Sequence, residues 1–324
     1  MSEPASASVP KVSVVLPARN ERDTLRLIVP AVAASLSKWT HEIIVVDDGS
    51  TDDTWNTVEE LKRGYGVRGI RFTRNFGHQA AILAGLSAAR GDAVIMMDSD
   101  GQHPPELLPA FVEQWESGAL VVQGIRRRDA DASAFKRWTS SVFYGLIRML
   151  AGVDIRSGSA DFRLLARPAL AQILASAGPL LFLRGLVPWL GYETALVPFD
   201  AGHRLAGSTS YTLRRMVRLS IDGLLSFSIV PLRIAVALGF LISAASFVYL
   251  AYVIGIRLTA GNVVPGWASM TALLSLLGGI QLLTLGVLGE YVGRLFVSTL
   301  NRPHYVIRDP AEAPSTSATR TPTT

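Results

Sequence analysis

The 324-residue sequence predicts an α/β protein in which a doubly wound, mostly parallel sheet is followed by amphipathic helices and a C-terminal hairpin of two transmembrane helices. Between residues 11 and 124, short β-branched runs alternate with helix-like stretches, as in βαβ units. Residues 213–227 place apolar side chains on one helical face and arginines on the other. Two later stretches without charged residues are each long enough to cross a bilayer.

Five strands and four helices are expected in the first part of the chain. The strands are residues 12–16, 42–46, 68–73, 93–97 and 120–123, and the helices are residues 24–37, 51–62, 79–90 and 106–116. Ligands of such sheets bind at the carboxyl ends of the strands. The polar segments 17–21, 47–50 and 98–102 fall at these ends, so this edge of the sheet is the expected site.

Two segments are expected to form amphipathic helices. Residues 135–150 carry an apolar stripe that fits packing on the domain as well as contact with a membrane surface. Residues 213–227 are rich in arginine and lead into an apolar segment, so they favour the membrane interface.

The membrane hairpin is expected from two uncharged stretches. Between Arg233 and Arg257 there are 23 uncharged residues, and residues 267–288 provide a second span after a turn. Arginines flank the outer ends of the hairpin, whereas the connecting loop has only Arg257. The positive-inside rule therefore puts the domain that contains the predicted sheet and both termini in the cytoplasm, on the inner membrane. The N-terminus lacks the features of a signal peptide.

These features divide the chain into five regions. We expect a disordered N-terminus at residues 1–10, the domain of the α/β sheet at 11–200, an interfacial region at 201–232, and two spans at 234–256 and 267–288 within 233–289. The last region is a tail at 290–324 that is disordered after about residue 310.

Composition excludes several classes of function. The chain has no cysteine, which excludes disulfides, cysteine-ligated zinc, iron–sulfur clusters and thiol nucleophiles. Its formal charge is +5, and the arginines cluster near the apolar segments. This placement favours anionic lipid and phosphorylated substrates, and we expect no nucleic-acid partner.

Asp98 and Asp100 are the candidate metal ligands. They follow the apolar strand 93–97 directly, and two carboxylates so close together repel unless a cation compensates them. Hard oxygens suit Mg²⁺ or Mn²⁺, which complete their coordination with substrate phosphates. His78 and His103 lack a third histidine nearby, so hydrogen bonding is the expected use of both.

Together with further motifs, these residues make the chain resemble glycosyltransferase family 2 with a GT-A fold. It is most similar to the polyprenyl-phosphate sugar transferases, which include the bactoprenol glucosyltransferases and dolichyl-phosphate mannose synthase. The matching segments are Val14–Glu21, Val45–Ser50, Arg74–Gln79, Asp98–Pro105, Gly124–Arg126, Ala160–Leu164, Arg204–Tyr211 and Gly289–Arg294, so that the resemblance extends over residues 11–308.

The resemblance implies a role for particular residues. Those that would bind the nucleotide-sugar are Pro17, Ala18, Asn20, Glu21, Asp47, Asp48, Asn75 and Asp98, and those that would bind the lipid phosphate are Arg126, Arg204, Ser210, Arg214 and Arg215. The catalytic set would be Asp100, Gln102, Asp161 and Arg163. One departure is that Thr209 and Ser210 replace the Ser-Lys pair of the family motif, so a lysine is missing there and Arg214 or Arg215 is the candidate to replace it.

Asp161 has three alternative roles. It could be a general base, it could orient Arg163 or the acceptor, or it could form a structural salt bridge with Arg163. A lipid monophosphate has its second pKa near about 6, so it is mostly a dianion at neutral pH and needs no base. The expected reaction is a direct displacement with inversion, in which the metal and the arginines stabilise the leaving diphosphate.

The expected function is therefore sugar transfer from UDP-glucose or another UDP-sugar to polyprenyl phosphate, for cell-envelope glycans or protein glycosylation. GDP-mannose stays open as the donor, and the resemblance suggests a homo-oligomer. A processive polysaccharide synthase would need a Gln-x-x-Arg-Trp motif, whereas Ala134 stands where its glutamine is required before Arg137-Trp138. A non-enzymatic scaffold would not need the paired aspartates.

Overall fold

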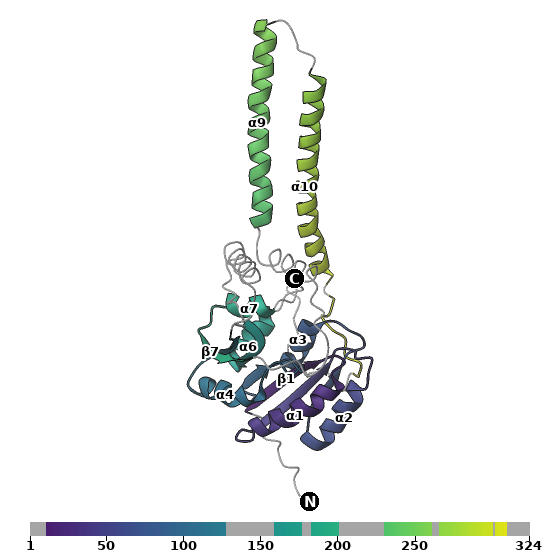
Figure 1. The fold of residues 1–324 in the computed structure, drawn as a ribbon, viewed down its shortest axis with the longest axis vertical. Helices are drawn as coiled ribbons and strands as arrows, with labels where there is room; N and C mark the ends of the chain where they lie inside the picture. The colour runs from purple at the N-terminus through teal and green to yellow at the C-terminus, as the bar shows by residue number, and fades with distance from the viewer. Residues whose placement is uncertain are drawn as a thin grey trace, which may run out of the picture. The chain divides into compact units, whose positions relative to one another are not determined.

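The computed structural model describes residues 11–127, 159–176, 183–200, 230–260, 266–300 and 302–309 (Figure 1). The chain divides into two compact units. The first contains the sheet together with residues 302–309, and the second contains the two long C-terminal helices. The expected amphipathic segments 135–150 and 213–227 lie outside the described residues.

The first unit is built on a seven-stranded sheet whose order is β3-β2-β1-β4-β6-β5-β7. The strands are β1 (Val12–Ala18), β2 (His41–Asp47), β3 (Arg68–Arg71), β4 (Ala93–Met96), β5 (Val121–Arg126), β6 (Ser159–Ala166) and β7 (Thr194–Phe199). β6 is antiparallel to β4 and β5, and all other neighbours are parallel. The doubly wound, mostly parallel sheet is thus confirmed.

Helices cover both faces of the sheet, because successive strand residues point to opposite sides. Val14 and Leu16 pack into one core cluster, whereas Val15 packs into the other. The first cluster is closed by α1 (Arg22–Ser35), α2 (Thr54–Tyr65) and α4 (Leu108–Glu116), which follows the short turn η1 (Pro105–Leu107). The second is closed by α3 (His78–Ala88), α6 (Arg167–Ser176) and α7 (Leu183–Trp189). Figure 1 shows these two sets of helices on opposite sides of β1.

The strand register determines which loops meet. Ala18 at the end of β1 pairs with Asp47 at the end of β2, and β4 runs parallel on the other side of β1. Asp161 and Arg163 lie on β6, the antiparallel neighbour of β4, and Arg163 pairs with Met96. The loops that carry the expected site residues therefore leave the sheet at one edge.

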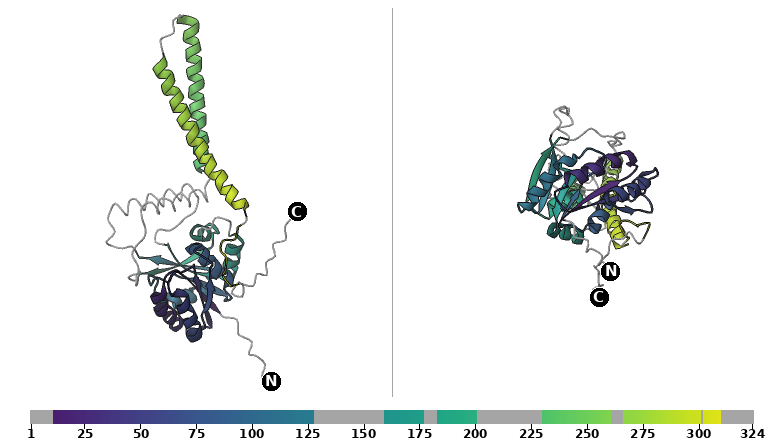
Figure 2. Two further views of the ribbon diagram at one scale, coloured as in Figure 1. Left: turned by 90° about the vertical axis from the view of Figure 1, so that its right-hand side faces the viewer. Right: turned by 90° about the horizontal axis from the view of Figure 1, so that it is seen from below.

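The second unit is a pair of helices, α9 (Val230–Ala260) and α10 (Trp267–Thr299), of 31 and 33 residues. They lie side by side in the views of Figures 1 and 2. By length and composition each is apolar enough to cross a membrane. α10 continues past residue 288, and its continuation carries an ion pair of 3.0 Å between Glu290 and Arg294.

Candidate functional site

The β1 and β2 loops are joined by hydrogen bonds at the carboxyl edge of the sheet. The Asn20 amide donates to Ser50 Oγ at 3.0 Å, and the Thr51 amide donates to Asn20 Oδ1 at 2.9 Å. Asn20 holds a positive φ of 56°, which asparagine tolerates better than most residues. Next to it, the Ala18 carbonyl accepts from the Asp48 amide at 2.9 Å. These contacts fix the two loops against each other.

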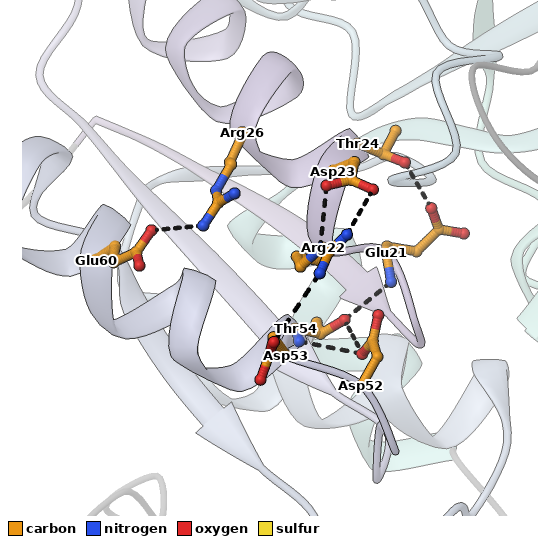
Figure 3. Close-up of polar contacts among 9 residues, drawn as sticks. All are labelled: Glu21, Arg22, Asp23, Thr24, Arg26, Asp52, Asp53, Thr54 and Glu60. Carbon is orange, nitrogen blue, oxygen red and sulfur yellow. Dashed lines mark hydrogen bonds and ion pairs between the residues drawn. The ribbon is translucent and has the colours of Figure 1, made fainter.

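Glu21 links the starts of α1 and α2 (Figure 3). Its amide donates to Thr54 Oγ1 at 2.9 Å, and its Oε2 accepts from Thr24 Oγ1 at 2.8 Å. Thr54 in turn donates its amide to Asp52 Oδ1 at 3.0 Å. Because this network is anchored on two helices, the position of the Glu21 carboxylate is well defined.

Asp47 and Asp48 are both buried but have different surroundings. Asp47 Oδ1 accepts from the Ser50 amide at 2.9 Å, while Oδ2 lies 3.5 Å from Arg71 Nε. Asp48 accepts from the amides of Phe76, at 2.6 Å, and Gly77, at 3.0 Å. Burial raises the pKa of Asp48, and these two amides oppose that shift. Asp48 therefore holds the segment between β3 and α3, which also contains Asn75.

The motif after β4 is held by His103 and by the β1 loop. The Asp98 amide donates to His103 Nδ1 at 2.9 Å, and Ser99 Oγ donates to the carbonyl of Pro17 at 2.7 Å. Asp100 Oδ1 accepts from the Gln102 amide at 3.0 Å. His103 stacks on Phe162 with ring centroids 4.9 Å apart, and burial lowers its pKa. His103 is thus a buried, neutral support for Asp98.

The start of α3 connects Asp98 with Asp161. His78 Nε2 lies 3.2 Å from Asp98 Oδ1 and 3.5 Å from Asp161 Oδ2. Gln79 Nε2 donates to Asp161 Oδ2 at 3.3 Å, and Gln79 Oε1 accepts from the Leu183 amide at 3.2 Å. The His78 side chain is 43% exposed, so its partial burial lowers its pKa, but the contacts with Asp161 and Asp98 have the larger effect and raise the pKa to about 10. His78 is therefore a cation between two carboxylates.

Asp161 and Arg163 are both 1% exposed on the interior strand β6. The Arg163 guanidinium donates through Nε to Gln123 Oε1. Gln123 also donates to the carbonyl of Phe162 at 3.2 Å. Burying two charged groups is costly unless they are paired or functional, so their position in the middle of the sheet marks this strand as part of the site.

The carboxylates after β4 fit a divalent cation. Asp98 Oδ1 is buried and makes no hydrogen bond of good geometry in the structure. Within the described ranges, no group of three or more His, Cys, Asp or Glu side chains could hold a metal alone. Mg²⁺ often uses only one or two carboxylates together with substrate phosphates, and this is the arrangement that Asp98 and Asp100 could supply.

The remaining expected residues are Arg126, which is described, and four residues that lie outside the described part of the chain. Arg126 ends β5 and is exposed, and its neighbour Arg127 pairs with Asp200 at 3.1 Å. Arg204, Ser210, Arg214 and Arg215 lie in a part of the chain that the structure does not describe.

Three sets of contacts in the site were not predicted from the sequence. These are the bridge from His78 to both carboxylates, the contact of Gln79 with Asp161, and the amides of Phe76 and Gly77 that hold Asp48. The sequence offered two signals for them, since Arg74–Gln79 is one of the segments that match the family and His78 was expected to form hydrogen bonds.

Comparison with known proteins gives the following similarities. Residues 13–174 match the family described as Glycosyl transferase family 2. The uncharacterized glycosyltransferase YkcC of Bacillus subtilis is 36% identical over 301 residues, which cover 91% of this chain and 93% of that protein. The bactoprenol glucosyl transferase of Shigella phage SfII is 35% identical, over 92% of this chain and 97% of its own.

Solved structures resemble the chain more distantly. Glucosyl-3-phosphoglycerate synthase from Mycobacterium tuberculosis, in complex with Mg²⁺ and uridine-diphosphate, matches 68% of this chain and 79% of its own. The identity is 24% and the TM-score is 0.49. Because the identity and the TM-score are this low, the bound metal and nucleotide describe that protein and are not transferred to this chain.

Proposed function

Since the chain belongs to glycosyltransferase family 2, we propose that it transfers a hexose from UDP-glucose, or another UDP-sugar, to the phosphate of a polyprenyl lipid. The observation that carries this proposal is the convergence of Asp98 and Asp161 on His78, beside the β1 and β2 loops. The alignment with a bactoprenol glucosyl transferase over 92% of the chain supports the lipid acceptor and the glucosyl donor.

The proposed reaction is a single displacement at the anomeric carbon. An oxygen of the acceptor phosphate forms the new bond to that carbon, and the bond to the nucleoside diphosphate breaks, so that the diphosphate leaves with the electron pair. Asp98 and Asp100 would hold a divalent cation, and such an ion would supply positive charge to stabilise the leaving diphosphate. The nucleoside would contact the joined β1 and β2 loops, whose residues are already fixed before substrate arrives.

Asp161 is proposed to position reacting groups and not to remove a proton. The acceptor phosphate is already a dianion at neutral pH, so a base adds little. His78 and Gln79 hold the Asp161 carboxylate from the start of α3. Asp161 is therefore placed to orient the acceptor or its basic partners, and His78 is a positioning residue for both carboxylates.

The two long apolar helices support a location in the inner membrane, with the catalytic unit and both termini in the cytoplasm. The arginines between residues 204 and 233 would meet anionic lipid headgroups and the acceptor phosphate. The donor is soluble and the acceptor is a membrane lipid, so a catalytic unit attached to a membrane hairpin suits the reaction. Assembly into a homo-oligomer remains part of the proposal.

Replacing His78 with glutamine is expected to lower kcat by about 10- to 100-fold, because the substitution removes the cation that touches both carboxylates and misplaces them. The KM for the nucleotide-sugar is expected to change less than kcat, since the contacts that join the β1 and β2 loops do not include His78. His78→Lys, which keeps a positive donor, should recover part of the rate.

Steady-state kinetics of the three proteins test this prediction, with His41→Gln as the matched control. His41 begins β2, at the opposite end of that strand from Asp47, and contacts the carbonyl of Trp39 at 3.0 Å. Equal losses of kcat in His41→Gln and His78→Gln would show that only general stability had changed.

The proposed function is tested by offering the purified full chain undecaprenyl phosphate with radiolabelled UDP-glucose, UDP-GlcNAc, UDP-galactose or GDP-mannose, with and without EDTA. We expect labelled lipid from a UDP-sugar, and no label in the presence of EDTA. If GDP-mannose is the only donor that gives labelled lipid, the donor is GDP-mannose and the UDP-sugar part of the proposal is wrong. No lipid product from any donor would refute the proposal.

A further inference from the structure

The chain returns to the sheet after α10. The Arg308 amide donates to the Arg71 carbonyl at 2.7 Å, and the Thr73 amide donates to the Val306 carbonyl at 3.0 Å. Between these two bonds, Phe72 and Ile307 form an antiparallel bridge. β3 is the edge strand of the described sheet, so residues 302–308, here called the tail segment, pair with backbone groups that would otherwise be open at that edge.

The side chains of the tail segment alternate as in a strand. Tyr305 and Ile307 pack against the core cluster that contains Phe72 and α3, whereas Val306 points outward and is 43% exposed. The Tyr305 ring stacks on Phe72 with centroids 5.0 Å apart and planes 9° apart, and its hydroxyl hydrogen-bonds Ser87 of α3. The segment is therefore docked by side chains as well as by backbone.

The residues that receive the tail segment lead directly to the site. Phe72 meets Phe76 edge to face at 5.7 Å, and the Phe76 amide donates to Asp48 at 2.6 Å. Arg71, which accepts from the tail, has its Nε 3.5 Å from Asp47 Oδ2. Residues 71–77 thus have the tail segment on one side and the aspartates of the β2 loop on the other.

We propose that the tail segment is a positioning element of the donor site, which holds residues 71–77 and through them Asp47 and Asp48. This inference rests on the proposed function, because it assumes that the two aspartates contact the nucleotide-sugar. Residues 71–77 include only the last residue of β3, so without the tail segment they lose two backbone bonds and an aromatic contact. The donor would then have to order this loop when it binds, which weakens its affinity.

The test uses the full chain in detergent, with Tyr305→Ala as the main variant. An aromatic pair contributes enough that its loss is expected to raise the KM for the nucleotide-sugar about three- to tenfold, while kcat stays within about twofold. Hydrogen exchange of the amides of residues 71–77 should become faster, and exchange of β5 should not change. Val306→Ala, which alters only an outward side chain, is the matched control. Tyr305→Phe keeps the ring but loses the hydroxyl contact with Ser87, so its effect should be smaller than that of Tyr305→Ala.

A second variant guards against a general loss of folding. Arg308→Pro removes the amide hydrogen that bonds the Arg71 carbonyl, at an exposed position, and should produce the same local increase in exchange. Unchanged exchange of residues 71–77 in both Tyr305→Ala and Arg308→Pro would overturn the proposal, and so would faster exchange with an unchanged KM.

If the parent protein transfers no sugar and binds no UDP, the proposed function fails, and the role of the tail segment in donor binding fails with it. Exchange at Phe76 and Gly77 then still decides whether the tail segment holds the loop.

Discussion

Asparagine in place of Asp98 or Asp100 is expected to lower kcat/KM for sugar transfer by about 10³-fold. Each substitution keeps the shape of the side chain and an acceptor oxygen but removes one charge that would hold the cation. Asp98 Oδ1 is a buried oxygen that makes no hydrogen bond of good geometry and lies 3.2 Å from His78 Nε2, so its charge is available to a cation at the site. Initial rates at increasing Mn²⁺ concentration measure the effect, and weaker metal activation should accompany the lower rate.

Asp23→Asn provides the matched control for both substitutions. The Asp23 side chain is 72% exposed at the start of α1 and pairs with Arg22 at the surface (Figure 3). An exposed ion pair contributes little, so this variant should stay within about twofold of the parent rate. Rates of Asp98→Asn and Asp100→Asn close to that of Asp23→Asn would rule out the metal assignment.

Replacement of Gly49 with alanine is expected to weaken nucleotide binding at least about tenfold. Gly49 has a φ of +64°, which costs an L residue roughly 1–2 kcal/mol. A β-carbon at this position would also lie 2.6 Å from the Asn75 amide nitrogen and still closer to the Arg74 backbone. The loop of residues 74–77 would have to move, and its amides would no longer hold Asp48 in place.

Gly66→Ala separates the clash from the backbone strain. Gly66 ends α2 with a φ of +66°, and an added β-carbon there would meet nothing within 4 Å. We therefore expect both variants to melt at a lower temperature than the parent, but only Gly49→Ala to lose affinity for UDP in a calorimetric titration. Equal affinity in the two variants would contradict the account of the loop.

Much of the first unit could be predicted because the sequence patterns there are simple. β1, β2, β4 and β5 are rich in valine and isoleucine, and the structure places the first five strands within three residues of the predicted bounds. Parallel strands bring their carboxyl ends to one edge of the sheet. Because each polar segment directly follows a predicted strand, the sequence was enough to predict that the loops after β1, β2 and β4 lie close together.

The strands β6 and β7 were not predicted. In β6, Asp161 and Arg163 interrupt the apolar pattern even though both are buried, which is the kind of local exception that functional sites produce. β7 contains Pro198, which suits an edge strand but weakens the strand pattern.

The contacts of the site depend on these missed elements. Gln79 reaches Asp161 across 82 residues of sequence because β6 is inserted antiparallel between β4 and β5. Docking of the tail segment could not be predicted either. The alternation of inward and outward side chains around Tyr305 and Ile307 is too short to indicate a strand. The family was identified correctly from the motifs, whereas the domain bounds and the roles of the site residues remain predictions.

The most direct test of the central claim is to identify the lipid product. The purified full chain is given UDP-glucose and Mg²⁺ with either undecaprenyl phosphate or undecaprenol, and the lipids are analysed by mass spectrometry. The account predicts one hexosyl residue added to undecaprenyl phosphate, release of UDP, and no product from undecaprenol. Glucosylation of the alcohol, or hydrolysis of the donor without any lipid product, would contradict it.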